Sequence, residues 1–152
     1  VTSAAVLHRA QYEALVRSIW LLFCATDEQV AKLLLRSGPE MAQTKKDLPM
    51  ATEMLWALQA KAPKEAYTPL ATFKESQWHA LNSFVHTGRH AIRPSSQSYP
   101  DQAIEGLLRN TNGLGVFTCA TVVIVTGHAN LQMNVYEIGN RYPECMHLRR
   151  DA

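Results

Sequence analysis

The sequence lacks the motifs that mark the common enzyme classes. It contains no G-x-x-x-x-G-K-[ST], no G-x-G-x-x-G after a strand, no H-E-x-x-H and no G-x-S-x-G. P-loop hydrolysis, a Rossmann cofactor and zinc peptidase chemistry are therefore disfavoured. Glu75 and His79 do not have the Glu-x-x-His spacing that di-metal helical bundles use. We therefore predict no metal site and no cofactor.

Cysteine is scarce, and its spacing predicts neither a disulfide framework nor a zinc site. Cys24, Cys119 and Cys145 are odd in number and form no C-x-x-C pair, a pattern typical of reduced core residues in a reducing compartment. The start of the chain lacks the basic and apolar regions of a signal peptide. These features favour a cytoplasmic location.

Long apolar runs and dense charge are also missing. The longest apolar stretch, residues 114–125, is interrupted by Gly and Thr and is shorter than the roughly 20 residues of a membrane span, so we predict no membrane contact. The net charge is +2 and no dense basic run occurs, which permits contact with nucleic acid but does not indicate it. The chain is 47% hydrophobic and 152 residues long, enough for one domain with a core.

Helical periodicity and helix start and stop signals are what the sequence does have. The predicted helices lie at 3–25, 27–36, 48–59, 68–86, 100–126 and 130–138. Thr26 to Gln29 has the form of a capping box, and Thr68-Pro69 and Gly127 provide a start and a stop signal. Val122 to Val125 have strand propensity, but no other alternating run exists with which a strand could pair. We predict an all-α fold, a single bundle of four to six helices over residues 1–152, with a loose tail from about residue 141.

The beginning of the chain suggests an incomplete bundle. A helical pattern is already running at Val1, so we expect that N-terminal helices are missing from this sequence. A chain with this many apolar helix faces should expose a patch that monomers rarely tolerate. We therefore predict a homodimer or a larger assembly.

Two stripes of polar residues lie on helices that are otherwise apolar. Glu13 and Arg17 fall within about 40° of each other on the first helix, which is apolar nearly all round, and a buried charge must be paired. The ordinary alternative is a surface pair worth roughly 0.2–0.5 kcal/mol. Asn82 and His86 share a face with Trp78 on the helix at 68–86. We predict that Glu13, Arg17, Asn82 and His86 cluster and satisfy one another.

The cluster has two interpretations. It can be a structural network that fixes the register of the helices. Alternatively, His86 is a general acid or base, Glu13 orients it and Arg17 binds an anion such as phosphate. We expect His79, His90 and His128 at the surface.

The motif residues resemble a family of uncharacterised bacterial helical proteins. The two motifs are Arg9-x2-Tyr12-Glu13-x3-Arg17-x2-Trp20 and Trp78-x3-Asn82-x3-His86-x-Gly88, and the sequence from Trp20 to Ala25 also fits. The chain departs from the family at Ser18, where Gly is usual. The resemblance covers about residues 3–127. It implies an all-helical fold with further N-terminal helices and points to the motif residues as the site, but it implies no activity.

Two functions from different classes remain open. One is a helical bundle that acts by association, as a regulatory or phage-defence-linked component with a protein partner. The alternative is a hydrolase or ribonuclease-like enzyme that uses the Glu/Arg/Asn/His cluster. The R-x4–6-H pattern of helical ribonucleases of the HEPN type is absent, which lowers the second assignment without removing it.

Overall fold

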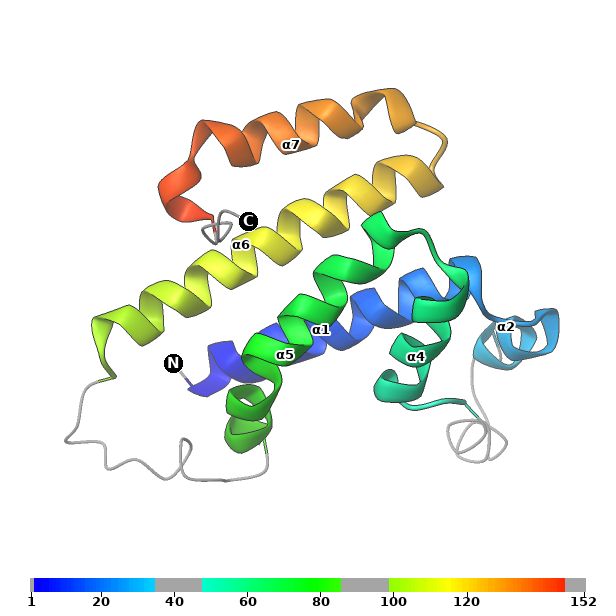
Figure 1. Ribbon diagram of the computed structural model, residues 1–152, viewed down its shortest axis with the longest axis horizontal. Helices are drawn as coiled ribbons and strands as arrows, with labels where there is room; N and C mark the ends of the chain where they lie inside the picture. The colour runs from blue at the N-terminus through cyan, green and yellow to red at the C-terminus, as the bar shows by residue number, and fades with distance from the viewer. Residues whose placement is uncertain (1, 35–47, 86–98, 147–152) are drawn as a thin grey trace. The chain divides into compact units, whose positions relative to one another are not determined.

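The computed structural model describes residues 2–34, 48–85 and 99–146 (Figure 1). These residues form six α-helices and two short 3-10 turns, with no strand among them. The predicted all-α fold is confirmed. Contacts within the chain divide it into two units, unit 1 formed by Val1–Gln11 with Ala80–Ala152 and unit 2 formed by Tyr12–His79. The single domain and the loose tail stay predictions.

Unit 2 is built from α1, α2, α4 and the larger part of α5. Their bounds are Thr2–Phe23, Asp27–Leu34, Ala51–Lys61 and Lys64–Val85, and α1 and α5 each extend into unit 1. The buried apolar side chains of unit 2 are Tyr12, Leu15, Val16, Ile19, Trp20, Met54, Leu55, Leu58, Leu70 and Phe73. On α1 these side chains recur at i, i+3, i+4, i+7 and i+8, so one stripe of the helix is covered.

Local hydrogen bonds explain where α2 and α4 begin. The Thr26 N–H donates to Gln29 Oε1 at 2.9 Å and the Gln29 N–H donates to Thr26 Oγ1 at 3.3 Å, which confirms the predicted capping box. The helix predicted at 48–59 occurs as α4 and begins later, because Pro49 disfavours helical geometry in the residue before it. Glu53 Oε2 then accepts the Met50 N–H at 2.7 Å.

The predicted start of α5 at Thr68 is wrong. The helix covers Lys64–Val85 and contains Pro69 in its interior. Its first turn forms because the Pro63 carbonyl accepts two N–H groups, at 3.0 and 3.1 Å. Pro69 offers no N–H to the Glu65 carbonyl, but both residues are exposed, so water can satisfy that carbonyl at little cost.

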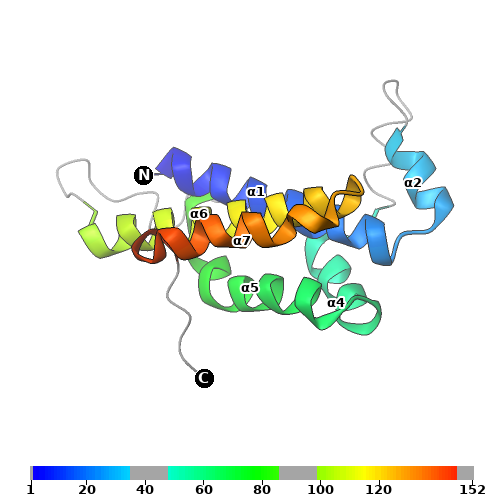
Figure 2. The ribbon, with the colours of Figure 1, turned by 90° about the horizontal axis from the view of Figure 1, so that it is seen from above.

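Unit 1 contains a helical hairpin formed by α6 and α7. These helices cover Asp101–Val125 and Gln132–Arg141, and they run side by side in both views (Figures 1 and 2). The 3-10 turn η1 at Ala129–Leu131 joins them after Gly127, whose φ of +80° is the left-handed conformation expected of a helix terminator. Helix α6 includes Val122 to Val125, so the helical prediction there is confirmed against their strand propensity.

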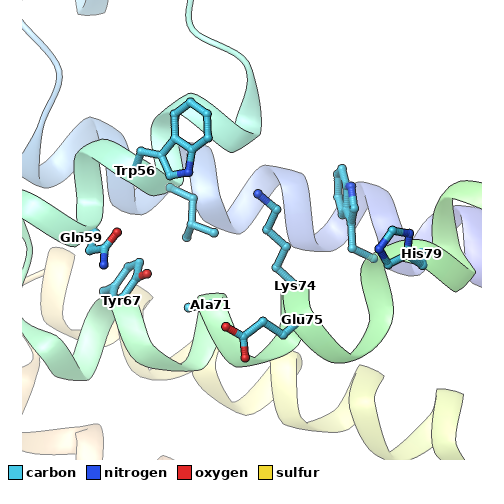
Figure 3. A pocket seen from close by; sticks show the side chains of 9 residues that line it. Trp56, Gln59, Tyr67, Ala71, Lys74, Glu75 and His79 are labelled. Carbon is cyan, nitrogen blue, oxygen red and sulfur yellow. The ribbon is translucent and has the colours of Figure 1, made fainter.

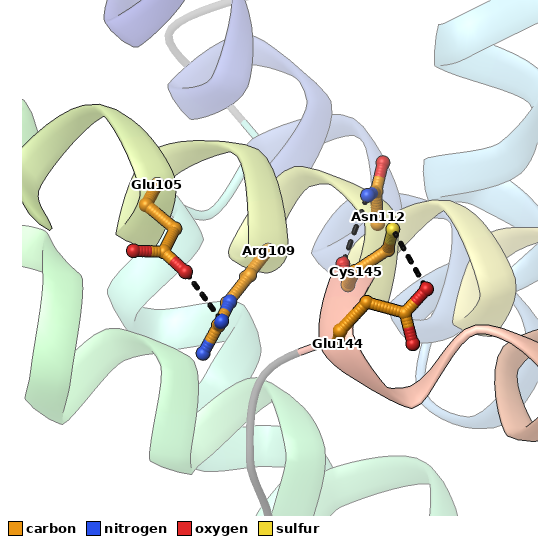
Figure 4. A network of polar contacts seen from close by, with 5 residues as sticks. All are labelled: Glu105, Arg109, Asn112, Glu144 and Cys145. Atoms are coloured by element: carbon orange, nitrogen blue, oxygen red, sulfur yellow. Dashed lines mark hydrogen bonds and ion pairs between the residues drawn. The ribbon is translucent and has the colours of Figure 1, made fainter. Parts of the chain in front are cut away.

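The chain after α7 turns back onto α6. The second 3-10 turn, η2, covers Pro143–Cys145, and the Asn112 amide donates to the Cys145 carbonyl at 2.9 Å (Figure 4). One turn before Asn112, Arg109 pairs with Glu105 on the same face of α6. The hydrogen bond from Asn112 to the Cys145 carbonyl joins α6 to η2, and it fixes where the chain leaves the hairpin.

The placement predicted for two cysteines is wrong. All three cysteines are free, but Cys119 and Cys145 are exposed, and Cys24 is half-buried. Cys119 lies on an outward face of α6, which periodicity could not identify because α6 carries small or apolar residues on every side. By length and composition alone α6 could cross a membrane, and 17% of its apolar window is buried; a single helix of this kind is weak evidence for a membrane span.

A buried histidine lies in unit 1. His8 is 2% exposed, and its Nδ1 lies 3.2 Å from Thr111 Oγ1 and 3.5 Å from Gln11 Oε1. Thr111 Oγ1 already donates to the Leu107 carbonyl, so it accepts from His8, which places the ring hydrogen on Nδ1. Burial lowers the pKa of His8 below its ordinary value, opposed by the hydrogen bond to Gln11.

Candidate functional site

The four predicted site residues lie in different parts of the chain, and the structure does not test whether they come together. Glu13 is half-buried and Arg17 exposed in unit 2, Asn82 is half-buried in unit 1, and His86 lies outside the described residues. The cluster therefore stays a prediction. The burial expected for Arg17 is wrong, because α1 is not covered all round: Phe23, for example, is also exposed at its surface.

A different site is formed within unit 2. A groove with a volume of about 330 Å³ lies between α4 and α5 (Figure 3). Its lining residues are Leu55, Trp56, Gln59, Tyr67, Ala71, Lys74, Glu75, Trp78 and His79. The groove therefore combines three large aromatic rings with a cation, a carboxylate, an imidazole and an amide.

Helix α4 presents its groove residues because its opposite face is buried. Met54 and Leu58 are almost fully buried, which turns Trp56 and Gln59 towards the surface. Trp56 is 65% exposed, an unusual state for the largest apolar side chain. A large aromatic ring is thus available at the rim of the groove.

Helix α5 supplies the rest of the groove from one continuous stripe. Its lining residues recur at i, i+4, i+7, i+8, i+11 and i+12 from Tyr67 to His79, which is the spacing of one helix face. Leu70 and Phe73 lie on the neighbouring buried stripe and anchor the helix. The orientation of the groove residues therefore follows from the burial of these two side chains.

Tyr12 fixes the inner wall of the groove. Its hydroxyl donates to the Leu70 carbonyl at 3.0 Å, and its ring stacks on Phe73 with centroids 4.6 Å apart. The same ring meets Trp78 edge-on, with centroids 5.9 Å apart. Burial raises the pKa of Tyr12, with smaller contributions from Tyr67 and Glu13.

The charges of the groove are balanced. Lys74 and Glu75 extend in opposite directions (Figure 3), and the Lys74 ammonium donates to Thr52 Oγ1 on α4 at 3.3 Å.

His79 is exposed, as predicted, and so is His128, while His90 lies outside the described residues. The nine lining residues place one ammonium, one carboxylate and one imidazole beside three aromatic rings.

The comparisons with known proteins identify a family without a known activity. The family model of DUF6988, described as a family of unknown function, matches residues 1–148. The chain belongs to this family. The resemblance to an uncharacterised family is thereby confirmed, whereas no curated protein and no solved structure matches the chain. The function of this DUF6988 protein must therefore be argued from its own residues.

The groove of this DUF6988 protein was not predicted from its sequence. The sequence pattern groups Trp78 with Asn82 and His86, and a helix start at Thr68 leaves Tyr67 outside α5, which begins at Lys64. With Lys64 as the start of the helix, the residues from Tyr67 to His79 that line the groove have the spacing of one helix face, and this spacing predicts the α5 side of the groove. The contribution of α4 carried no comparable signal, because it depends on how two separate helices pack.

Proposed function

We propose that this protein acts by association and that the groove between α4 and α5 binds a segment of a partner protein. The observation that carries the proposal is Trp56, exposed at the rim of a groove that also contains buried Leu55. Protein interfaces place apolar and aromatic groups at the centre with polar groups around them, and tryptophan is enriched among the residues that contribute most binding energy.

The chemistry of the groove favours a polypeptide over an anionic ligand. One ammonium and one carboxylate give no net attraction for phosphate, and nucleic-acid binding needs a basic surface. A peptide segment has the matching properties: an apolar side chain for the surface around Ala71, and charges of both signs for Lys74 and Glu75. The Gln59 amide supplies a donor and an acceptor for the peptide backbone.

A binding module of this kind fits a regulatory role, including a role as a phage-defence-linked component. Recognition of a partner requires only a surface such as the groove and no catalytic residues. The alternative, a hydrolase or ribonuclease-like enzyme, depends on the cluster of Glu13, Arg17, Asn82 and His86. Arg17 is exposed and Glu13 is half-buried, whereas the groove provides a site for association that does not depend on the cluster, so association is the better supported function.

The proposal is tested with a random peptide library displayed on phage. The library is selected against the wild-type protein and against two variants, Ala71→Arg and Ala60→Arg. Ala71 lines the groove, so the arginine fills it, whereas Ala60 is exposed on α4 outside the lining and receives the same charge and bulk. We expect enriched peptides with an apolar residue between opposite charges, which bind wild type and Ala60→Arg but not Ala71→Arg.

Two results would argue against this function. One is a selection that enriches no peptide, and the other is enrichment that Ala71→Arg and Ala60→Arg weaken equally. Cleavage of RNA by the purified protein, lost in Arg17→Ala and His86→Ala, would instead favour the enzyme alternative.

A further inference from the structure

The two opposite charges of the groove between α4 and α5 differ in their partners. The Lys74 ammonium donates to Thr52 Oγ1 at 3.3 Å. Glu75 has neither a hydrogen bond nor an ion pair within the part of the chain that the structure describes. Glu75 is also exposed, whereas Lys74 is half-buried. The carboxylate is therefore the charge that is more available to a ligand.

The surroundings of Glu75 suit a cation with a flat and partly apolar surface. Tyr67, Ala71 and Glu75 follow one another at intervals of four residues on α5, so they form a row along one face of the helix. Glu75 bends back towards Ala71, and Trp56 lines the same groove from α4 (Figure 3). Because the Ala71 side chain is small, the space beside the carboxylate stays open between two aromatic residues.

The size of the groove limits what enters it to a single side chain. Its volume of about 330 Å³ is at the lower end of the roughly 300–1,000 Å³ of small-ligand sites. An α-helix with its side chains is about 10–12 Å wide, which is too much for such a space. One long side chain of a partner segment, with its charge at the tip, matches both the volume and the exposed carboxylate.

We propose that the groove takes an arginine side chain of the partner segment, with Glu75 as its counter-ion, between the rings of Trp56 and Tyr67. This inference rests on the proposed function of the groove and names the residue that anchors the partner. A guanidinium is flat, pairs with a carboxylate through two hydrogen bonds and stacks on aromatic rings, whereas a lysine ammonium is compact and strongly hydrated. Gln59 adds an amide oxygen that accepts a further guanidinium N–H.

The ammonium of Lys74 opposes a cation in the groove, and its position limits that effect. Lys74 and Glu75 extend in opposite directions, and the Lys74 ammonium reaches α4, where Thr52 accepts its hydrogen bond (Figure 3). An arginine that pairs with Glu75 therefore lies on the side of the carboxylate. Neutralising Lys74 should leave the binding of arginine unchanged or make it tighter, whereas neutralising Glu75 should weaken it.

The experiment titrates the protein with N-acetyl-arginine amide and follows the tryptophan indole N–H signals by NMR. A ligand of this size should bind with a dissociation constant of about 1 mM. The Trp56 signal should shift, and the Trp20 signal should not, because Trp20 is 3% exposed and lies outside the lining. Glu75→Gln should weaken binding by about tenfold, and Lys74→Gln, the matched control, should not weaken it. The uncharged isostere N-acetyl-citrulline amide should bind the wild type about as weakly as the arginine probe binds Glu75→Gln.

Three results overturn the choice of arginine. One is the absence of any shift of the Trp56 signal, and another is equal affinity for the arginine and citrulline probes or for the arginine probe and N-acetyl-lysine amide. The third is tighter binding of N-acetyl-glutamate amide that is lost in Lys74→Gln, which assigns the groove to an acidic side chain.

The peptide library separates this inference from the binding function itself. Enriched peptides that share an arginine, with that preference lost when the library is selected against Glu75→Gln, support the inference. Enriched peptides that lack a shared arginine and are still blocked by Ala71→Arg leave the groove as a binding site and overturn the inference alone. Glu75 is exposed, so Glu75→Gln should fold normally, and circular dichroism checks this.

Discussion

Tyr12 is the residue whose replacement tests the packing beneath the groove most sharply. Its side chain is 1% exposed, makes one buried hydrogen bond and contacts two other rings. Tyr12→Phe removes the hydrogen bond to the Leu70 carbonyl and keeps the ring. The net value of such a bond is about 0.5–1.5 kcal/mol, so the free energy of unfolding should fall by about 1 kcal/mol.

Tyr12→Ala removes the ring as well. Truncation of a buried aromatic side chain to alanine costs about 3–5 kcal/mol, and a lost aromatic pair adds about 0.5–1.5 kcal/mol. The total of about 3.5–6.5 kcal/mol is a large part of the roughly 5–15 kcal/mol that stabilises a typical domain. We therefore expect Tyr12→Ala to be partly unfolded at room temperature.

Urea unfolding followed by far-UV circular dichroism measures both effects. The matched control is Tyr142→Phe, because Tyr142 is 51% exposed and an exposed position should change stability by less than about 0.5 kcal/mol. The reasoning is refuted if Tyr12→Phe is as stable as wild type and Tyr12→Ala loses less than about 2 kcal/mol. It is also refuted if Tyr142→Phe has the larger effect of the two phenylalanine variants.

Two further predictions concern unit 1. Because burial lowers the pKa of His8, the unfolded chain takes up the proton first as the pH falls. The free energy of unfolding should be constant above about pH 7 and decrease below the ordinary histidine pKa of 6.5. The variant His8→Asn keeps a donor near the position of Nδ1 but does not titrate, so it should flatten this pH dependence. Unfolding experiments at several pH values measure both effects. Gly139→Leu should destabilise by about 1–3 kcal/mol, because even a Cβ there lies 3.1 Å from the end of the Met146 side chain. Gly106→Ala should instead stabilise α6 by about 0.5–1 kcal/mol, since its Cβ meets nothing within 4 Å, and a melting temperature that falls in both glycine variants would contradict this contrast.

Features that depend on a few neighbouring residues were predictable from the sequence. The capping box of Thr26 and Gln29 and the stop at Gly127 both follow from local backbone chemistry. The start of α5 was missed because Thr68-Pro69 is a stronger local signal than Lys64, although an exposed helix tolerates the proline.

Features that depend on packing between distant segments were not predictable. Arg17 and Cys119 are exposed because of which helix faces are covered, and periodicity cannot decide this in helices that are apolar on several sides. The groove needs α4 and α5 together, and its rim residue Trp56 showed no sign in the sequence that it would be exposed.

The central claim, that the groove between α4 and α5 binds a partner protein, is tested most directly by photocrosslinking in cells that produce this protein. Benzoylphenylalanine is placed at Gln59, which lines the groove, or at Lys64, which is exposed on α5 outside it. We predict a discrete crosslinked species from position 59 that disappears with Ala71→Arg and is absent from position 64. The absence of any crosslink from position 59, or the same species from both positions regardless of Ala71→Arg, would contradict the claim.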